Sequence, residues 1–280
     1  ALVPGRERNI VLGFWGSTMP AGMALIIALA PLALALVGWR GLWWIAGALS
    51  LVMLAALAYA TRDTAAPEEG VAEPPAPLAR NVRLTVARLA PWLIFGAFAL
   101  FTFQWTSVMV WLPTYLIEDK GYGLGTAALL TALVVAVNVP GNLTAGFLIH
   151  RGVSRWLMVA IAGAAMGLSV LVVFADGVGD GMRFAACLAF SYFGGLLPTA
   201  TRAAVPLFAP SHAQLGTTNG LLGQGANLGQ LIGPPAVAAI VAATGAWGQA
   251  RWLMAAAAVG IVALALWSRA AERRALAEGR

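Results

Sequence analysis

Long apolar stretches separated by short polar ones dominate the pattern along this chain. A helix needs about 20 apolar residues to cross the hydrocarbon core of a membrane, and eight stretches reach about that length. The polar connections between them are mostly short. The pattern predicts an all-α, polytopic membrane protein whose eight transmembrane helices lie at residues 10–37, 42–61, 90–117, 124–149, 156–175, 183–206, 214–243 and 250–268.

The composition supports this prediction and argues against an enzyme. Hydrophobic residues make up 60% of the chain and charged residues 10%, whereas a soluble domain carries about 25% charged residues. The single cysteine, Cys187, excludes an internal disulfide. Since no HExxH motif, Walker loop or Ser/His pairing within a span is present, we expect no catalytic site, metal or cofactor, and no nucleic-acid partner.

Basic residues predict which ends of the spans face the cytoplasm. With eight alternating spans, twelve basic residues fall on one side of the membrane and four on the other. The richer side carries both chain ends, so we predict a multi-pass protein of the bacterial inner membrane with both ends cytoplasmic. The twelve are Arg6, Arg8, Arg62, Arg80, Arg83, Arg88, Arg151, Arg155, Arg269, Arg273, Arg274 and Arg280.

Residues 62–81 form one long polar stretch among these spans. Their Pro, Glu and Ala content cannot bury a core, so they predict a flexible cytoplasmic linker. Residues 82–90 follow as a short surface helix. The linker divides two spans from six.

A parallel repeat relates the two ends of the chain. A shift of 207 residues places every glycine of residues 9–41 on another glycine, from Gly13 on Gly220 to Gly38 on Gly245. Six spans separate the copies, an even number, so the repeat keeps its direction through the membrane. The last six spans then form a complete unit. The first two are the end of another unit, whose first four spans are absent from this sequence.

The predicted span at 214–243 has two contrasting faces. Gly225, Gly229 and Gly233 recur every four residues, and Asn227 lies roughly 200° around the helix from Gly225. Small residues let a neighbouring helix approach closely, whereas an amide in lipid is costly unless it faces protein or water. We therefore predict a helix in the wall of a pathway, with Asn227 facing that pathway.

The linker, the repeat and one local motif resemble the major facilitator superfamily, whose members have two six-helix bundles. The motif is GFLIHRGVSR (146–155), similar to that family's Gly-x-x-x-Asp-Arg-x-Gly-Arg-Arg pattern. Gly146, Arg151 and Arg155 match, and His150 replaces the acid. The resemblance covers the whole chain as helices five to twelve of the family. The general residue pattern is similar to that of its cyanate-permease-like subgroup.

This resemblance implies an organisation and a function. Residues 1–61 would be the last two helices of the N-terminal bundle, residues 62–89 the cytoplasmic linker, and residues 90–280 the C-terminal six-helix bundle with a cytoplasmic tail. The expected function is secondary active transport of a small solute, such as an organic anion, by alternating access in the lipid bilayer. The full-length permease is expected to be monomeric. The alternative is a non-transporting membrane scaffold or sensor on the same fold.

Polar side chains inside the spans are the candidate substrate contacts. Gln104 and Ser107 share one face of the span at 90–117, and the resemblance makes that helix cavity-lining. The other candidates lie in three further spans. The alternative for each is packing, because polar side chains often bond a neighbouring helix for about 0.6 kcal/mol and bind nothing. The substrate-binding candidates are Gln104, Ser107, Asn138, Tyr192 and Asn227.

Asn142, Arg151, Arg155 and Arg202 are expected to make gating or loop contacts near the cytoplasmic ends. Apart from Arg183 and Arg251 at the very starts of their spans, Arg202 is the one basic side chain within a predicted span, and a guanidinium suits an anion. It lies about four residues from the predicted end, so snorkelling or a gate contact is favoured over substrate binding. All eleven acidic residues fall in loops or tails, which predicts that any proton-coupling carboxylate lies on the missing helices or that coupling uses another route.

Overall fold

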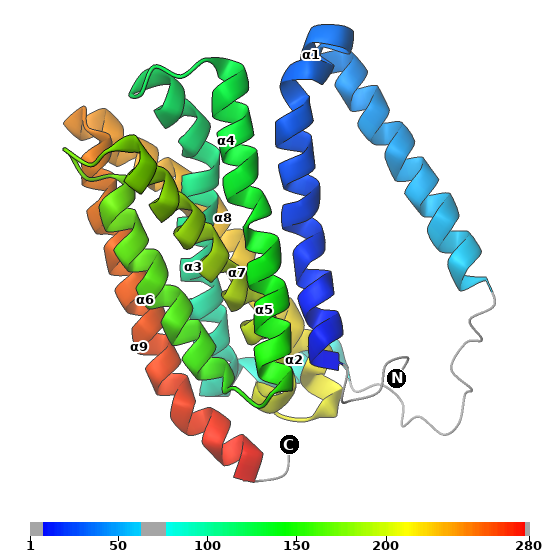
Figure 1. The fold of residues 1–280 in the computed structure, drawn as a ribbon. Helices are drawn as coiled ribbons and strands as arrows, with labels where there is room; N and C mark the ends of the chain where they lie inside the picture. Colours follow the sequence, from blue (N-terminus) through cyan, green and yellow to red (C-terminus); the bar gives the residue numbers. More distant parts are fainter. Residues whose placement is uncertain (1–7, 63–76, 278–280) are drawn as a thin grey trace.

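A computed structural model describes residues 8–62 and 77–277 of the chain (Figure 1). Within these ranges every regular element is a helix, which confirms the all-α prediction. The elements are α1 Arg8–Thr61, α2 Leu78–Val86, α3 Leu89–Glu118, α4 Leu124–Ala136, α5 Asn138–His150, α6 Arg155–Val173, α7 Asp180–Phe208, η1 His212–Gln214, α8 Leu215–Thr244, η2 Trp247–Gln249 and α9 Ala250–Ala277.

The helix α1 consists of two membrane spans joined at Gly38. Its apolar part, Ile10–Thr61, has 52 residues, or about 78 Å of helix, which is more than twice the ~30 Å hydrocarbon core. Gly38 has a left-handed φ of 65°, which favours glycine. The second half of α1 turns back there and leans away from the other helices (Figure 1). Gly245, the repeat partner of Gly38, also has a left-handed φ, of 66°.

The remaining spans follow the predicted pattern with one interruption. Leu124–His150 is long and apolar enough to cross a membrane, yet the helix breaks at Val137 between α4 and α5. Pro140 follows closely and lacks the N–H that would continue the hydrogen-bond ladder. The predicted surface helix is α2, which begins at Leu78 instead of residue 82. Most of the predicted linker, residues 63–76, lies outside the described residues.

The glycine face of α8 packs on α3. A Cβ atom added at Gly225 would lie 2.6 Å from the carbonyl oxygen of Phe95, and one at Gly229 would lie 2.7 Å from the amide nitrogen of Phe103. Backbones can approach this closely only where a side chain is missing. The glycine periodicity therefore specifies a contact inside the six-helix unit and fixes the rotation of α8 about its axis.

Glu272 joins the end of α9 to the start of α6. Its side chain is 1% exposed, and its two carboxylate oxygens accept hydrogen bonds from the backbone N–H groups of Arg155 (3.0 Å) and Trp156 (2.9 Å). The guanidinium of Arg155 lies 3.5 Å from the same carboxylate. A carboxylate at a helix N-terminus satisfies free N–H donors and complements the helix dipole. The sequence pattern placed Glu272 in a tail, but α9 continues through it to Ala277.

We expect the substitution Glu272→Ala to lower the free energy of unfolding by about 2 kcal/mol, because hydrogen bonds to charged groups contribute about 1.5–3 kcal/mol. The thermal unfolding midpoint of the purified protein in detergent should fall by several degrees. Arg273→Ala is the matched control, since Arg273 is the next residue of the same helix and is exposed. An equal midpoint for both variants would contradict a stabilising role for this cap.

Candidate functional site

A cavity of about 260 Å³ opens between α1, α3, α5, α7 and α8. Two of its lining residues, Asn138 and Gln230, lie near the middle of their membrane-crossing segments, Leu124–His150 and Leu215–Thr244. The cavity therefore lies about half-way through the predicted membrane. Its lining consists of Trp15, Gly16, Thr18, Met19, Pro20, Phe98, Phe101, Thr102, Trp105, Thr106, Asn138, Pro198, Arg202, Ala226 and Gln230.

Arg202 supplies the positive charge of this cavity. Its guanidinium carbon lies 4.6 Å from the ring centre of Trp15 on α1 and 5.2 Å from that of Phe98 on α3. Aromatic faces attract a guanidinium without using its N–H donors. Among residues 8–62 and 77–277, no acidic side chain pairs with Arg202. The cavity is thus lined by a guanidinium whose N–H donors have no hydrogen-bond partner among the described residues.

Arg202 lies six residues before Phe208, the last residue of α7, which corresponds to about 9 Å of helix. The sequence favoured snorkelling to the surface or a gate contact for this residue. The structure instead places Arg202 against the cavity, because two aromatic rings from other helices flank its guanidinium. Gating by Arg202 stays a prediction.

Asn138 and Asn142 belong to a hydrogen-bonded cluster beside the cavity. The Asn142 amide donates to Asn138 Oδ1 (2.8 Å), and the Thr199 hydroxyl donates to Asn142 Oδ1 (3.0 Å). The Asn138 amide donates to the carbonyl of Ser191 (2.9 Å). Asn138 lines the cavity with both of its polar groups engaged. Asn142 is fully buried next to Gly16 of α1, so it contributes to the contact between α1, α5 and α7.

Gln104 and Ser107 lie away from the cavity. The Gln104 amide donates to the carbonyl of Met254 on α9 (2.8 Å), and the Ser107 hydroxyl donates to the carbonyl of Phe103 within α3 (2.5 Å). The cavity-lining residues of α3, such as Phe98 and Trp105, occupy the opposite side of the helix. Both side chains thus make packing contacts in this arrangement, and substrate contact by Gln104 and Ser107 stays a prediction.

Tyr192 and Asn227 do not line the cavity either. The Tyr192 hydroxyl is hydrogen-bonded to the hydroxyl of Thr144 on α5 (3.1 Å). Asn227 is exposed on the side of α8 that faces away from α3. Substrate contact by these two residues stays a prediction.

The two arginines of the loop motif have different surroundings. Arg151 is exposed, with its guanidinium 4.2 Å from the ring centre of Phe147. Arg155 pairs with Glu272, as described above. Gly146 allows α1 to pass close to α5, since a Cβ on Gly13 would lie 3.4 Å from Gly146 Cα. Gate contacts by Arg151 and Arg155 stay predictions.

Comparison with known families now identifies the chain. The model of the Major Facilitator Superfamily matches residues 1–212, which is well over half of the sequence. The chain belongs to the major facilitator superfamily. It is therefore a multi-pass membrane protein of a transporter family and not an enzyme, as the sequence predicted.

Individual superfamily members show how far the likeness extends. A probable sulfoacetate transporter of Cupriavidus necator is 27% identical over 292 residues, which covers 94% of this chain and 65% of that protein. The chain thus spans somewhat less than two thirds of the length of this curated relative.

Two solved structures share the fold. A bacterial homologue of the human lysosomal transporter Spinster, in an inward-facing and unoccupied conformation, matches with a TM-score of 0.57 and 19% identity, over 92% of this chain and 65% of that one. The Escherichia coli fucose:proton symporter matches with a TM-score of 0.55 and 21% identity, over 68% of this chain and 45% of that one.

The superfamily assignment makes the cavity at Arg202 the leading candidate site. Several of the residues that line this cavity were not predicted from the sequence. On α8 the glycine face packs on α3, so the cavity borders the flank of the helix. Ala226 and Gln230 line that flank, whereas Asn227 points away. The positions of these residues around the helix axis could have indicated this. Gln230 lies roughly 100° from the middle of the glycine face, and Asn227 lies roughly 160° from it.

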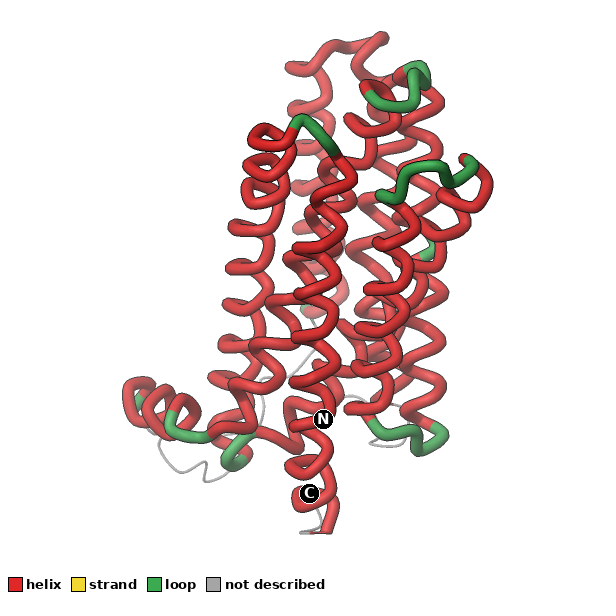
Figure 2. Tube along the Cα trace, turned by 90° about the vertical axis from the view of Figure 1, so that its left-hand side faces the viewer, coloured by secondary structure: helices red, strands yellow, loops and turns green. Residues whose placement is uncertain are grey.

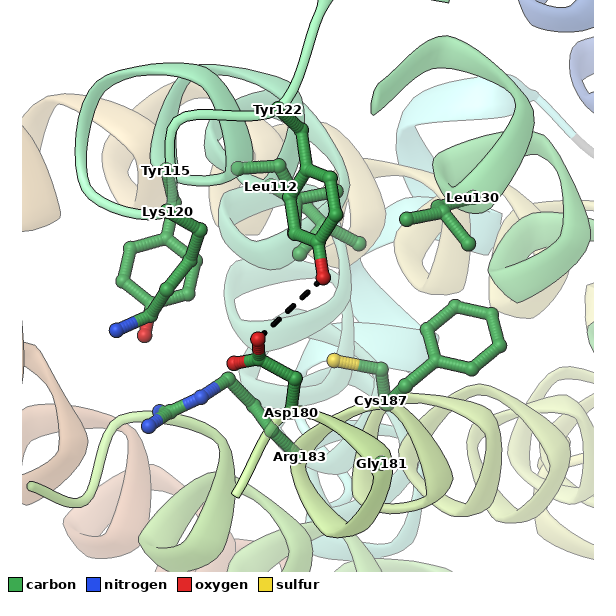
Figure 3. A pocket seen from close by; sticks show the side chains of 11 residues that line it. Leu112, Tyr115, Lys120, Tyr122, Leu130, Asp180, Gly181, Arg183 and Cys187 are labelled. Atoms are coloured by element: carbon green, nitrogen blue, oxygen red, sulfur yellow. Dashed lines mark hydrogen bonds between the residues drawn. The ribbon is translucent and has the colours of Figure 1, made fainter. Parts of the chain in front are cut away.

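A second cavity of about 240 Å³ lies between the end of α3, α4 and the start of α7 (Figure 3). Its charged side chains have partners within the described residues. The Tyr122 hydroxyl donates to Asp180 (3.4 Å), and Arg183 donates to the carbonyls of Val173, Ala175 and Val178. Lys120 forms an ion pair with Asp119 (2.8 Å), and this hydrogen bond raises the pKa of Lys120.

Arg183 thus caps the C-terminal end of α6, where the free carbonyls attract a cation. Among the described residues, Lys120, Asp180 and Arg183 of the second cavity have ion-pair or hydrogen-bond partners, whereas Arg202 has neither, and this difference distinguishes the first cavity.

Proposed function

We propose that this chain belongs to a secondary transporter that moves a small organic anion across the bacterial inner membrane by alternating access, with both chain ends in the cytoplasm. The observation that carries the proposal is the guanidinium of Arg202, which faces a mid-membrane cavity and has no acidic partner within the described residues. A charge at that depth is costly unless something compensates it. A bound anion supplies the missing counter-charge.

The flanking aromatic rings connect anion binding to helix movement. Trp15 belongs to α1, the end of the proposed first bundle, and Phe98 belongs to α3, the start of the second. An anion held at Arg202 lies where these helices meet, so its binding free energy depends on their relative position. A ligand that favours one arrangement over another shifts the population between them, which is the requirement for alternating access.

The cavity restricts the substrate to a small molecule with few charges. Its volume of about 260 Å³ is below the ~300–1,000 Å³ typical of pockets for drug-sized ligands. Gln230 has no hydrogen-bond partner among the described residues, so its amide is free to bind a second polar group. A two- or three-carbon carboxylate or sulfonate fits these features, in agreement with the name of the Cupriavidus necator relative.

Transport by the reconstituted protein tests the proposal. We expect proteoliposomes to take up labelled sulfoacetate or a similar short-chain anion, and unlabelled small carboxylates and sulfonates to compete. Choline and neutral sugars of similar size should not compete. The assay uses the chain together with any sequence that precedes it in its gene.

Two outcomes would contradict the proposal. Competition by cations or neutral solutes, with none by anions, would exclude an anion site at Arg202. The absence of solute-dependent flux and of anion binding for the whole panel would favour the alternative, a non-transporting scaffold or sensor on the same fold.

A further inference from the structure

The short helix α2 has two chemically different faces. With about 100° of rotation per residue, Leu78, Val82 and Val86 share one side, whereas Arg80 lies roughly 160° and Arg83 roughly 100° around the helix from Val82. The three apolar side chains are 73%, 43% and 42% exposed. They border an open groove of about 550 Å³ beside the start of α8. An exposed apolar face opposite a basic one is typical of helices that lie in a membrane interface.

The surrounding structure sets the orientation of α2. The hydroxyl of Thr85 is hydrogen-bonded to that of Thr217 (2.8 Å), and the Gln214 amide donates to Asn81 Oδ1 (2.9 Å). At the corner with α3, the indole N–H of Trp92 donates to the carbonyl of Val86 (2.9 Å). These bonds hold α2 across the ends of the spans (Figures 1 and 2), so both of its faces have a defined direction relative to the bundle.

Within the described residues, the charged side chains on α2 and at its junction with α3 are all positive. Residues 77–117 contain Arg80, Arg83 and Arg88 and no acidic residue. Within the part of the chain that the structure describes, no carboxylate pairs with these three arginines. All three are exposed. Trp92, 40% exposed beside them, is a residue type that favours the headgroup region.

We propose that α2 is a lipid-binding element, whose arginines at positions 80, 83 and 88 bind the phosphates of anionic phospholipids while Leu78, Val82 and Val86 contact the acyl chains. Basic residues beside an amphipathic surface attract anionic lipids by charge. Because α2 is bonded to the start of α8 through Thr217 and Gln214, bound lipid stabilises the cytoplasmic end of the six-helix bundle. This role is independent of the transported solute.

Lipid-dependent thermal stability tests the charged face. The chain, purified in a mild detergent, is titrated with dioleoyl phosphatidylglycerol or with dioleoyl phosphatidylcholine, and the unfolding midpoint is recorded. We expect the anionic lipid to raise the midpoint by several degrees more than the zwitterionic one. The double variant Arg80→Gln/Arg83→Gln should lose at least half of this difference. The double variant Arg273→Gln/Arg274→Gln, with the same loss of charge at exposed positions on α9, should keep it.

Equal responses to the two lipids, or an unchanged difference in the Arg80/Arg83 variant, would overturn the proposal. A difference that instead follows protein concentration and accompanies dimer formation would show that a second copy of the chain covers α2, and would also overturn it.

Spin labels test the apolar face separately. In a Cys187→Ala background, labels at Val82→Cys and Arg83→Cys are compared in phosphatidylglycerol-containing liposomes. We expect the label at position 82 to collide more with dissolved oxygen and the label at position 83 to collide more with a water-soluble nickel complex. Greater exposure of position 82 to the nickel complex would place this face in water and refute membrane contact.

Discussion

The substitution Arg202→Gln is expected to weaken anion binding about 30- to 100-fold and to abolish measurable uptake at low substrate concentration. A hydrogen bond to a charged group contributes about 1.5–3 kcal/mol, and about 1.4 kcal/mol corresponds to a tenfold change in affinity. Glutamine keeps an amide donor but loses the charge. The structural basis is the position of Arg202 in the cavity, between the rings of Trp15 and Phe98.

Binding of a labelled short-chain carboxylate or sulfonate to the purified protein measures this effect directly, and uptake by proteoliposomes measures its consequence. Arg202→Lys should show an intermediate loss, because lysine keeps the charge without the planar fork of donors. Arg273→Gln, which removes an exposed arginine of α9, should leave the affinity unchanged. An Arg202→Gln variant with the affinity of the original protein would mean that Arg202 serves the local structure only.

Two glycine substitutions on α8 are expected to have opposite effects on stability. A Cβ at Gly229 would overlap the carbonyl oxygen of Ala99 and the hydroxyl of Thr102 on α3. Gly229→Ala must therefore separate α3 from α8, and overpacking of this kind typically costs about 1–3 kcal/mol. A Cβ at Gly223 meets no atom within 4 Å. Gly223→Ala should be neutral or stabilising, since alanine is favoured over glycine inside a helix by about 1 kcal/mol.

Thermal unfolding of the two variants in the same detergent compares them. We expect a midpoint several degrees lower for Gly229→Ala, and an unchanged or higher midpoint for Gly223→Ala. Similar decreases in both would show that the glycines act through the flexibility of α8 and not through its contact with α3. A stable Gly229→Ala variant would contradict the close packing of these two helices.

The helical architecture could be predicted because every helix that crosses the lipid needs an apolar stretch of about 20 residues. Each of the eight predicted spans corresponds to a helical segment, and the second begins after the left-handed Gly38. The ends were less predictable. The helix α9 continues beyond its apolar stretch because the buried carboxylate of Glu272 caps α6, a contact between residues more than 110 positions apart.

The candidate site was predictable only in part. Asn138 lines the cavity, and its contact with substrate stays a prediction, whereas Gln104 donates to a carbonyl of α9. Both are amides in the middle of a span, so residue type and depth do not separate them. What separates them is the rotation of each helix about its axis, which depends on the neighbours that it contacts.

The sequence alone therefore determined that this chain crosses the membrane repeatedly and that it resembles the superfamily to which it belongs. It also predicted a parallel repeat between the two ends of the chain. These properties follow from the length of apolar stretches, the spacing of glycines and the positions of charges, all of which are readable along one dimension. The tertiary structure decided which polar groups face the cavity. Arg202 lies there because α1 and α3 bring Trp15 and Phe98 to its two sides, and contacts between distant segments leave no local pattern in the sequence.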